Sequence, residues 1–195
     1  MLLVVGITGA SGVIYGIRLL EVLSANKAVE THLVVSKAGA QNIKYETDWK
    51  LKQVTALADF YYDIDDTGAA LASGSFKIDG MIVAPCSMKT LSAVANSYTD
   101  NLLTRTADVT LKERRKLILL VRETPLHLGH LTNMEKVTEM GAVVLPPIPA
   151  FYHRPRTIQE VVDHTIGKVL DILDIEHNLF PRWSGTAGEK STPTK

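Results

Sequence analysis

The chain has 195 residues, 46% of them apolar, with 21 basic and 21 acidic side chains that give a formal net charge of zero. A chain of this length suits one compact domain with a sizeable core, and the balanced charge argues against a nucleic-acid backbone or an anionic membrane as partner. The single cysteine, Cys86, excludes an intrachain disulfide framework and a multi-cysteine metal site, and it fits a reducing, cytoplasmic compartment.

The first predicted element is a buried strand from Leu2 to Ile7. This apolar run lacks a basic leader, is far shorter than a membrane span and leads directly into glycines. Apolar residues then recur at helical spacing, from Ile14 to Leu23, and predict an amphipathic helix. Strand, turn and helix in this order begin a βαβ unit.

Further strands and helices alternate along the chain. The sequence predicts strands at His32 to Ser36, Met81 to Pro85, Lys116 to Val121 and Ala142 to Leu145, a weaker strand at Tyr61 to Ile64, a helix at Lys37 to Glu46, and another from about Trp49 with Asp48 as its N-cap. This alternation is typical of an α/β domain. We expect one open parallel sheet, Rossmann-like or flavodoxin-like, with helices on both faces.

Two capping boxes predict where the later helices begin. Thr132 to Glu135 marks one start, with Gly141 as its stop, and Thr157 to Glu160 opens a helix that runs to about Leu173. Residues 1–183 are therefore expected to form one folded domain. Residues 184–195 offer nothing to bury and are expected to form a disordered tail.

The turn from Gly6 to Gly12 is a candidate phosphate site. It follows the first strand, and ligands of open α/β sheets bind at the carboxyl ends of strands. Its glycines lack the Cβ atoms that would keep a phosphate away from backbone N–H groups at a helix N-terminus. The run matches neither the G-x-G-x-x-G dinucleotide fingerprint nor the P-loop, so a plain tight turn remains the alternative.

A second hydroxyl cluster follows the strand from Met81 to Pro85. Ser87 and Thr90 lie three residues apart, so both face one ligand from the first turn of a helix. An ordinary N-cap serine is the alternative for Ser87 taken alone. Two such turns after adjacent strands favour a ligand site.

Arg105 and Lys112 lie two helical turns apart and share one face of a continuous helix. Asp108 between them offers a simpler interpretation, in which it pairs with both cations in a solvated network of little energetic value. From these residues alone that interpretation is preferred.

Taken together, several separated motifs resemble those of the UbiX/Pad-type flavin prenyltransferases. The resemblance runs from residue 2 to about Trp183, with the motifs in the family's order. They are Thr8-Gly9-Ala10-Ser11-Gly12, Ser36-Lys37, Ala72-Ser73-Gly74-Ser75, Pro85-Cys86-Ser87-Met88-Lys89-Thr90-Leu91, Ala107-Asp108-Val109 with Leu111-Lys112-Glu113-Arg114-Arg115, Arg122-Glu123-Thr124-Pro125, and Phe151-Tyr152-His153.

The resemblance implies an FMN-binding flavoprotein domain that joins a dimethylallyl group from dimethylallyl monophosphate to reduced FMN. A bond forms from the dimethylallyl C1 to flavin N5, and a second ring closes through flavin C6. The prenylated FMN is supplied to a UbiD-type decarboxylase, as in ubiquinone biosynthesis or aromatic acid decarboxylation. The family tends to form homo-dodecamers.

The resemblance also implies the roles of individual residues. FMN binding is expected of Gly9, Ala10, Ser11, Ser36, Ser87, Met88, Lys89, Thr90 and Arg122. The prenyl phosphate is expected to contact Tyr152 and Lys168, joined by Arg105 and Lys112, for which a neighbouring subunit is one source. The catalytic set is Ser11, Glu46, Glu123, Arg105 and Lys112, with Glu46 and Glu123 as proton-handling groups.

One position departs from the family pattern. Many members have Arg where this chain has Lys168. An ammonium group binds phosphate as a point charge and lacks the bidentate fork of a guanidinium, so the departure puts the donor's affinity in doubt more than its identity.

Two segments are candidates for a metal site. Asp63-Ile64-Asp65-Asp66 lacks the D-D-x-x-D spacing of diphosphate prenyltransferases and is interpreted as a solvated loop. His127 and His130 are possible ligands, but Gly129 and Pro125 predict a loop and no third ligand is evident. We therefore expect no metal, and we interpret Cys86 as a packing residue.

Two alternative functions share the flavin site. An FMN-dependent decarboxylase of the phosphopantothenoylcysteine type would have a Pro-x-Met-Asn-x-x-Met-Trp segment, which this chain lacks. An FMN-carrying accessory subunit of an aromatic-acid decarboxylase would not need a second phosphate site at Tyr152 and Lys168.

Overall fold

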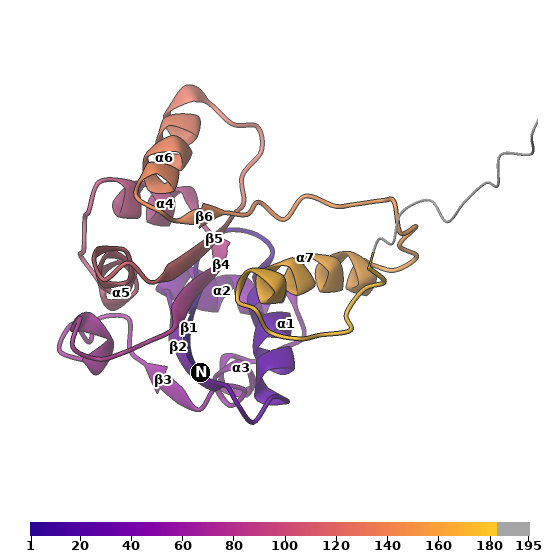
Figure 1. The fold of residues 1–195 in the computed structure, drawn as a ribbon, viewed down its shortest axis with the longest axis horizontal. Coiled ribbons are helices and arrows are strands. Elements are labelled where there is room, and N and C mark those ends of the chain that lie inside the picture. The colour runs from indigo at the N-terminus through magenta and orange to yellow at the C-terminus, as the bar shows by residue number, and fades with distance from the viewer. Residues whose placement is uncertain (183–195) are drawn as a thin grey trace, which may run out of the picture.

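In the computed structural model, which describes residues 1–182, six strands form one sheet in the order β3-β2-β1-β4-β5-β6 (Figure 1). The strands are β1 (Leu2–Ile7), β2 (Glu30–Val35), β3 (Phe60–Tyr62), β4 (Gly80–Cys86), β5 (Lys116–Val121) and β6 (Val143–Val144). All neighbouring pairs are parallel. The expected open parallel sheet is confirmed, and its strand order is that of the doubly wound Rossmann fold rather than the 2-1-3-4-5 order of flavodoxin.

Helices cover both faces of the sheet. They are α1 (Val13–Ser24), α2 (Lys37–Glu46), α3 (Leu51–Thr55), α4 (Met88–Ala95), α5 (Leu102–Lys112), α6 (Leu128–Glu139) and α7 (Ile158–Ile172), with a short 3₁₀ helix, η1 (Ala70–Ala72). Consecutive strand residues point to opposite faces. In β1, Leu3 and Val5 pack in the core shared with α1, α2, α3 and α7, whereas Val4 packs in the core shared with α4, α5 and α6. Strands buried on both faces explain the continuous apolar runs in the sequence.

Several predicted elements match the structure closely. β1, α2 and β5 have the predicted bounds. β2 begins two residues earlier than predicted and ends at Val35, because Ser36 leaves the strand to cap α2. β3 is displaced to Phe60–Tyr62, and β6 pairs over only two residues. Thr157 caps α7 as predicted, accepting a hydrogen bond from the Glu160 N–H at 3.2 Å.

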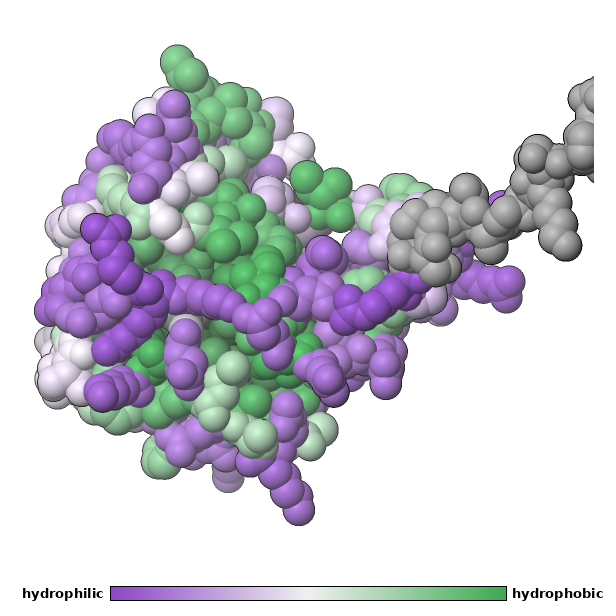
Figure 2. Space-filling view, viewed as in Figure 1, coloured by the Kyte–Doolittle hydropathy of each residue, from purple (hydrophilic) through white to green (hydrophobic). Residues whose placement is uncertain are grey.

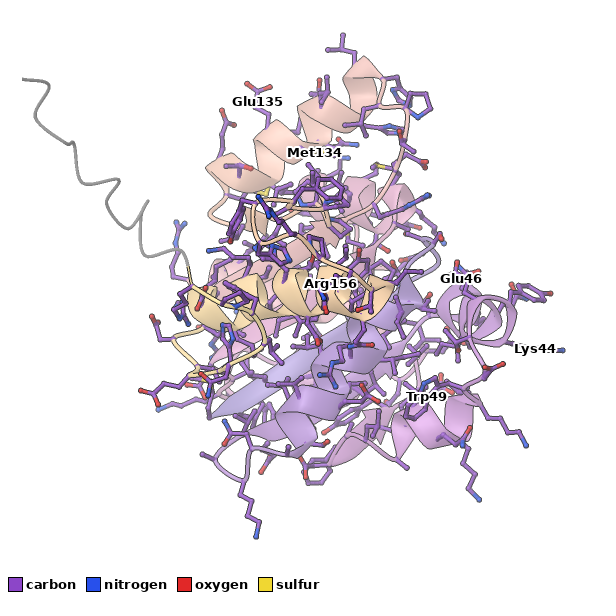
Figure 3. The ribbon with its side chains drawn as sticks, turned by 90° about the vertical axis from the view of Figure 1, so that its right-hand side faces the viewer. Lys44, Glu46, Trp49, Met134, Glu135 and Arg156 are labelled. Carbon is purple, nitrogen blue, oxygen red and sulfur yellow. The ribbon has the colours of Figure 1, made fainter. Side chains whose placement is uncertain are left out.

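Two predictions about helix starts are wrong, and so is the loop predicted around Gly129. Asp48 caps no helix, because α3 begins only at Leu51, and the Lys50 N–H donates to Gln53 Oε1 at 2.8 Å. The box at Thr132 lies within α6, and Figure 3 shows Met134 and Glu135 part-way along that helix. The helix starts instead at Leu128, and His127 Nδ1 accepts the Gly129 N–H at 3.0 Å. Gly129 therefore belongs to the first turn of a helix and not to a loop.

The predicted disordered tail, residues 184–195, lies outside the described residues, as does Trp183. No helix in residues 1–182 combines the length and the apolar character that a membrane span requires.

Candidate active site

A cavity of about 450 Å³ lies at the carboxyl ends of β1, β2 and β4. The strand order reverses between β1 and β4, since the chain continues from β1 to β2 on one side and later returns to β4 on the other. The connections that leave the sheet there diverge, which opens the crevice in which doubly wound folds bind ligands. The location agrees with the prediction from the polar residues that follow these strands.

Three helix N-termini meet at this cavity, because the N-cap residues of α2, α4 and α5 all line it. Ser36 Oγ accepts the Gly39 N–H at 3.0 Å, Ser87 Oγ accepts the Thr90 N–H at 3.3 Å, and Asn101 Oδ1 accepts the Thr104 N–H at 3.0 Å. Each N-terminus carries partial positive charge. Their convergence makes this cavity suitable for an anionic group such as a phosphate.

The hydroxyl groups around the β4–α4 turn are held by one another. Thr8 Oγ1 donates to the Pro85 carbonyl at 2.7 Å and accepts the Ser87 N–H at 2.8 Å. Ser87 Oγ in turn donates to Thr90 Oγ1 at 3.1 Å. This network joins the end of β1 to the start of α4, so the cavity has a fixed polar wall.

Several charged side chains line the cavity, and some of them have partners there. Lys37 Nζ lies 2.7 Å from Asp65 Oδ2, and this hydrogen bond is the main reason why the pKa of Lys37 is raised. Asp100 Oδ1 accepts a hydrogen bond from Asn101 Nδ2 at 2.7 Å. Lys89 also lines the cavity. The two carboxylates oppose an anion, so a phosphate fits better at the hydroxyl-lined wall formed by Ser36, Ser87 and Thr90.

The turn after β1 is built differently from the prediction. Glu46 Oε2, at the end of α2, accepts the N–H groups of Gly12 and Val13 at 2.7 and 3.3 Å and so caps α1 (Figure 3 shows Glu46). A Cβ atom on Gly9 would collide with the Cβ of Ala38. In this structure a carboxylate accepts those two N–H groups, and Gly9 makes room for α2 beside the cavity. The role of the turn in phosphate binding stays a prediction.

Two further predicted residues follow β5. The Arg122 N–H donates to the Cys86 carbonyl at 3.1 Å, which places Arg122 beside the β4–α4 turn. Glu123 Oε1 accepts the Thr124 N–H at 3.0 Å. Cys86 itself is fully buried, and burial raises the pKa of its thiol well above the usual range. A neutral, buried thiol fits the packing role that we expected.

On α5, Arg105 and Lys112 have separate partners. Arg105 Nη1 lies 3.0 Å from Asp108 Oδ2, and its Nε donates to the Ala72 carbonyl at 3.1 Å. Lys112 pairs with Glu113, and that hydrogen bond lowers the pKa of the Glu113 carboxyl. The expectation that Asp108 pairs with both cations is wrong for Lys112. Both cations remain partly exposed, so an incoming anion can reach them.

Tyr152 and Lys168 lie near the C-terminal end of the described chain. Tyr152 Oη lies 2.9 Å from Nε2 of the buried His164 on α7. Lys168 follows four residues later on the same helix, and its Nζ lies 3.6 Å from Asp171 Oδ2. Residues three or four apart share a helix face, so His164 lies between the two predicted ligands of the prenyl phosphate.

The structure brings together only part of the predicted site. Five of the predicted residues line the cavity: Gly9, Ser36, Ser87, Lys89 and Thr90. The remainder do not: Ala10, Ser11, Met88, Arg122, Glu46, Glu123, Arg105, Lys112, Tyr152 and Lys168. In Figure 1, α5 and the segment that precedes α7 lie on opposite sides of the molecule. Within one chain the four donor-phosphate residues therefore form two separate groups.

Some polar residues that line the cavity were not among the predicted site residues: Lys37, Asp65, Asp100, Asn101 and Thr104. Asn101 carried a usable signal, because an Asn directly before the apolar pair Leu102 and Leu103 is a typical N-cap. No sequence signal marked Asp65 as a cavity residue, because it reaches the cavity through the loop after β3.

The metal candidates adopt other roles. Asp63 Oδ1 accepts the Asp65 N–H at 2.8 Å, which forms the predicted turn. His127 caps α6, and its ring lies 3.6 Å from the ring of His130, centroid to centroid. Among residues 1–182, no group of three or more His, Cys, Asp or Glu side chains is placed to hold a metal ion.

Comparisons with known proteins agree with the geometry. The sequence matches the Flavoprotein family over residues 1–182. It is 58% identical over 185 residues to the flavin prenyltransferase UbiX of Thauera aromatica, covering 95% of both chains.

Two solved structures are also similar. One is a dodecameric FMN-dependent UbiX-like decarboxylase from Escherichia coli O157:H7, with TM-score 0.93, 48% identity and coverage of 95% of this chain and 100% of that one. The other is AnUbiX (PadA1) in complex with FMN and dimethylallyl pyrophosphate, with TM-score 0.91, 50% identity and coverage of 94% and 97%.

Proposed function

Because the chain belongs to the Flavoprotein family and, within it, to the UbiX flavin prenyltransferases, we propose that it transfers a dimethylallyl group from dimethylallyl monophosphate to reduced FMN. The protein is thus an enzyme, and FMN serves as its acceptor substrate. The observation that carries this proposal is the 58% identity over 95% of both chains, joined to a cavity on which three helix N-termini converge.

The residues of the cavity fit a flavin mononucleotide. Hydroxyl groups and helix N-termini form one wall and suit the phosphate. Ile64, Ala93 and Leu103 add apolar surface that suits a flavin ring. Of the residues expected to bind FMN, Arg122 lies beside this wall through its bond to Cys86, whereas Ala10 and Ser11 belong to the turn after β1.

Reduced FMN, when bound, supplies the nucleophilic positions N5 and C6 to which the dimethylallyl group is joined. Cleavage of the allylic carbon–oxygen bond leaves positive charge on the prenyl group and negative charge on the departing phosphate. The protein accelerates this step by stabilising the phosphate with cations and hydrogen-bond donors, which act most strongly once a covering surface excludes water from them.

We assign the donor's phosphate to Tyr152, Lys168, Arg105 and Lys112. In the isolated chain each cation is partly exposed and paired with a carboxylate: Asp108 for Arg105, Glu113 for Lys112 and Asp171 for Lys168. Exposed pairs of this kind contribute little. A phosphate, with more negative charge, can therefore compete for these cations at small cost.

Glu46 and Glu123 are the proposed proton-handling groups. Glu46 is held at the N-terminus of α1 by two backbone N–H groups, which fixes one carboxylate oxygen. The other oxygen takes part in none of these bonds in the described chain and has the freedom to accept a proton from a bound substrate. Within residues 1–182, the Glu123 carboxylate accepts one hydrogen bond, from the Thr124 N–H of its own turn, and it has similar freedom.

We propose that the donor site is completed by neighbouring copies in a homo-oligomer, a dodecamer like that of the E. coli O157:H7 relative. Large apolar side chains are exposed on α6, on the segment before α7 and at the first residue of α7, including Leu128, Ile148, Phe151 and Ile158. Figure 2 shows apolar surface at the tip of α6. Such exposure marks interaction surfaces. A UbiD-type decarboxylase is the proposed recipient of the product, in the cytoplasm.

The test is to incubate the purified protein with reduced FMN and dimethylallyl monophosphate without oxygen, and to weigh the flavin by mass spectrometry. We expect a flavin heavier by one dimethylallyl unit, with dimethylallyl diphosphate as a weaker donor. Bound FMN of unchanged mass would refute transferase activity and favour a flavin carrier. Release of carbon dioxide from a cysteinyl substrate would instead favour a decarboxylase.

A further inference from the structure

We infer that His164 is a positioning residue for the transfer reaction: it holds the Tyr152 phenol so that the Tyr152 O–H points at a phosphate oxygen of the donor. This inference rests on the proposed function, because it assigns Tyr152 to the donor's phosphate. It concerns a residue that was absent from the predicted site. His164 acts through Tyr152 and not by its own contact with a substrate.

The first reason is that Tyr152 needs an anchor. It lies in the segment between β6 and α7, which has neither helix nor strand and contains four prolines at positions 146, 147, 149 and 155. The Tyr152 residue is 51% exposed. A hydrogen bond to a helix restricts the orientations open to an exposed phenol on such a segment. The bond to His164 Nε2, at 2.9 Å, ties the phenol to the rigid helix α7.

The second reason is that His164 itself is fixed. It is 8% exposed, and three aromatic rings surround it. His153 stacks on it with centroids 4.8 Å apart and planes 6° apart, Phe180 packs at 4.6 Å, and Tyr152 meets it edge-on at 5.6 Å. A ring enclosed in this way has one orientation, so its Nε2 offers Tyr152 a fixed partner.

The third reason is the charge state of the imidazole. Burial is the main cause that lowers the pKa of His164, and the nearby His153 and Lys168 lower it further, while Asp171 opposes them. His164 is therefore neutral at neutral pH and carries one N–H. Phosphate oxygens only accept hydrogen bonds, so Tyr152 must donate to them. The tautomer with hydrogen on Nε2 is compatible with this, because His164 then donates to Tyr152 Oη and does not accept the Tyr152 O–H.

The test compares His164→Leu, which removes the bond, with His164→Gln, whose amide restores a donor near the same place. Measured with saturating reduced FMN and no oxygen, His164→Leu should raise the KM for dimethylallyl monophosphate about three- to tenfold, the range expected for one hydrogen bond. Its kcat should stay within about twofold, because the bond exists before and during the reaction. His164→Gln should recover most of the loss. Retained FMN shows that each variant is folded, and His164→Met replaces the leucine variant if it loses FMN.

A double-mutant cycle shows whether His164 acts through Tyr152. In a Tyr152→Phe background, His164→Leu should add no further rise in KM. The inference would be overturned if His164→Leu raised the KM equally in both backgrounds, or if it left the KM at the wild-type value. It would also be overturned if His164→Gln were as impaired as His164→Leu.

Calorimetric titration with dimethylallyl monophosphate alone measures the same comparison without turnover. If wild-type protein bound the donor but gave no heavier flavin, the proposed transfer would be refuted. The dissociation constants of the donor for wild type and His164 variants would still test the role of His164. If the wild type bound no donor, both the proposed transfer and the role of His164 would be overturned.

Discussion

The proposed flavin cavity and the proposed donor-phosphate residues are built in opposite ways. Hydroxyls and helix N-termini at the cavity are fixed by short hydrogen bonds among themselves, at the ends of buried strands of one chain. The donor residues lie on helix surfaces and on an irregular segment, partly exposed and paired with carboxylates. The flavin region is therefore preorganised within one chain, whereas the donor region depends on what covers it. Mutations in the two regions should have different effects.

The largest expected effect comes from a negative charge in the cavity. Ser36→Asp keeps a good N-cap for α2 but places a carboxylate beside the phosphate wall. Two unit charges about 4 Å apart repel by about 4 kcal/mol at an effective dielectric constant of 20, so FMN affinity should fall roughly 1000-fold. Ser36→Asn is the matched control, because it also caps the helix without charge. Equal flavin affinity of the two variants, measured by fluorescence titration, would place the phosphate elsewhere.

Glu46→Gln should have the next largest effect, and on turnover only. The amide oxygen can still accept the N–H groups of Gly12 and Val13, so the stability should change by less than about 1 kcal/mol. The loss of a proton-handling carboxylate should lower kcat roughly 100-fold. Thermal unfolding and single-turnover kinetics measure the two quantities. A variant with normal kcat would restrict Glu46 to capping α1.

Gly9→Ala tests the packing that shapes the cavity. The added Cβ collides with Ala38 in the first turn of α2, and overpacking of this kind costs about 2 kcal/mol, or roughly 4–8 °C in Tm. The double variant Gly9→Ala with Ala38→Gly restores the space and should recover most of the loss, with Ala38→Gly alone as control. If the double variant were no more stable than Gly9→Ala, contact with Ala38 would not explain the glycine.

Lys168→Ala should have the smallest effect. The side chain is about half exposed and its ion pair with Asp171 is long, at 3.6 Å, so its loss should hardly change stability. The KM for dimethylallyl monophosphate should rise about tenfold with FMN affinity unchanged, as for the loss of one charged hydrogen bond. Lys168→Arg adds a bidentate fork and should lower this KM below that of wild type. A loss of FMN instead would move Lys168 into the flavin region.

The sequence predicted the sheet and the cavity's location well, for a physical reason. β1 and β5 are buried on both faces, so their apolar runs are unbroken, and Ser36 and Ser87 are strong N-cap residues directly after strands. These signals are local. The start of α6 was missed because His127 caps it through a ring nitrogen, which lies outside the usual set of capping residues.

Long-range contacts explain which features of the site the sequence did not show. Glu46 caps α1 from a position 34 residues further along the chain, so no local pattern in the glycine turn shows that its N–H groups are occupied. The link between Tyr152 and His164 likewise joins an irregular segment to a helix. The bond from Arg105 to the Ala72 carbonyl in η1 is also long-range, whereas the pairs of Arg105 with Asp108 and of Lys112 with Glu113 are local.

The most direct test of the contrast between the two regions is subunit complementation. Ser36→Asp should bind no flavin, and Arg105→Gln should bind flavin but transfer poorly, so each homo-oligomer should be nearly inactive. Co-expressed with different tags and purified through both, the mixed oligomer should again yield heavier flavin, because Arg105 of one chain completes the site of a flavin held by another. If the mixed oligomer were no more active than its parents, Arg105 would serve the flavin of its own chain, and the proposal of a donor site completed by neighbouring copies would be contradicted.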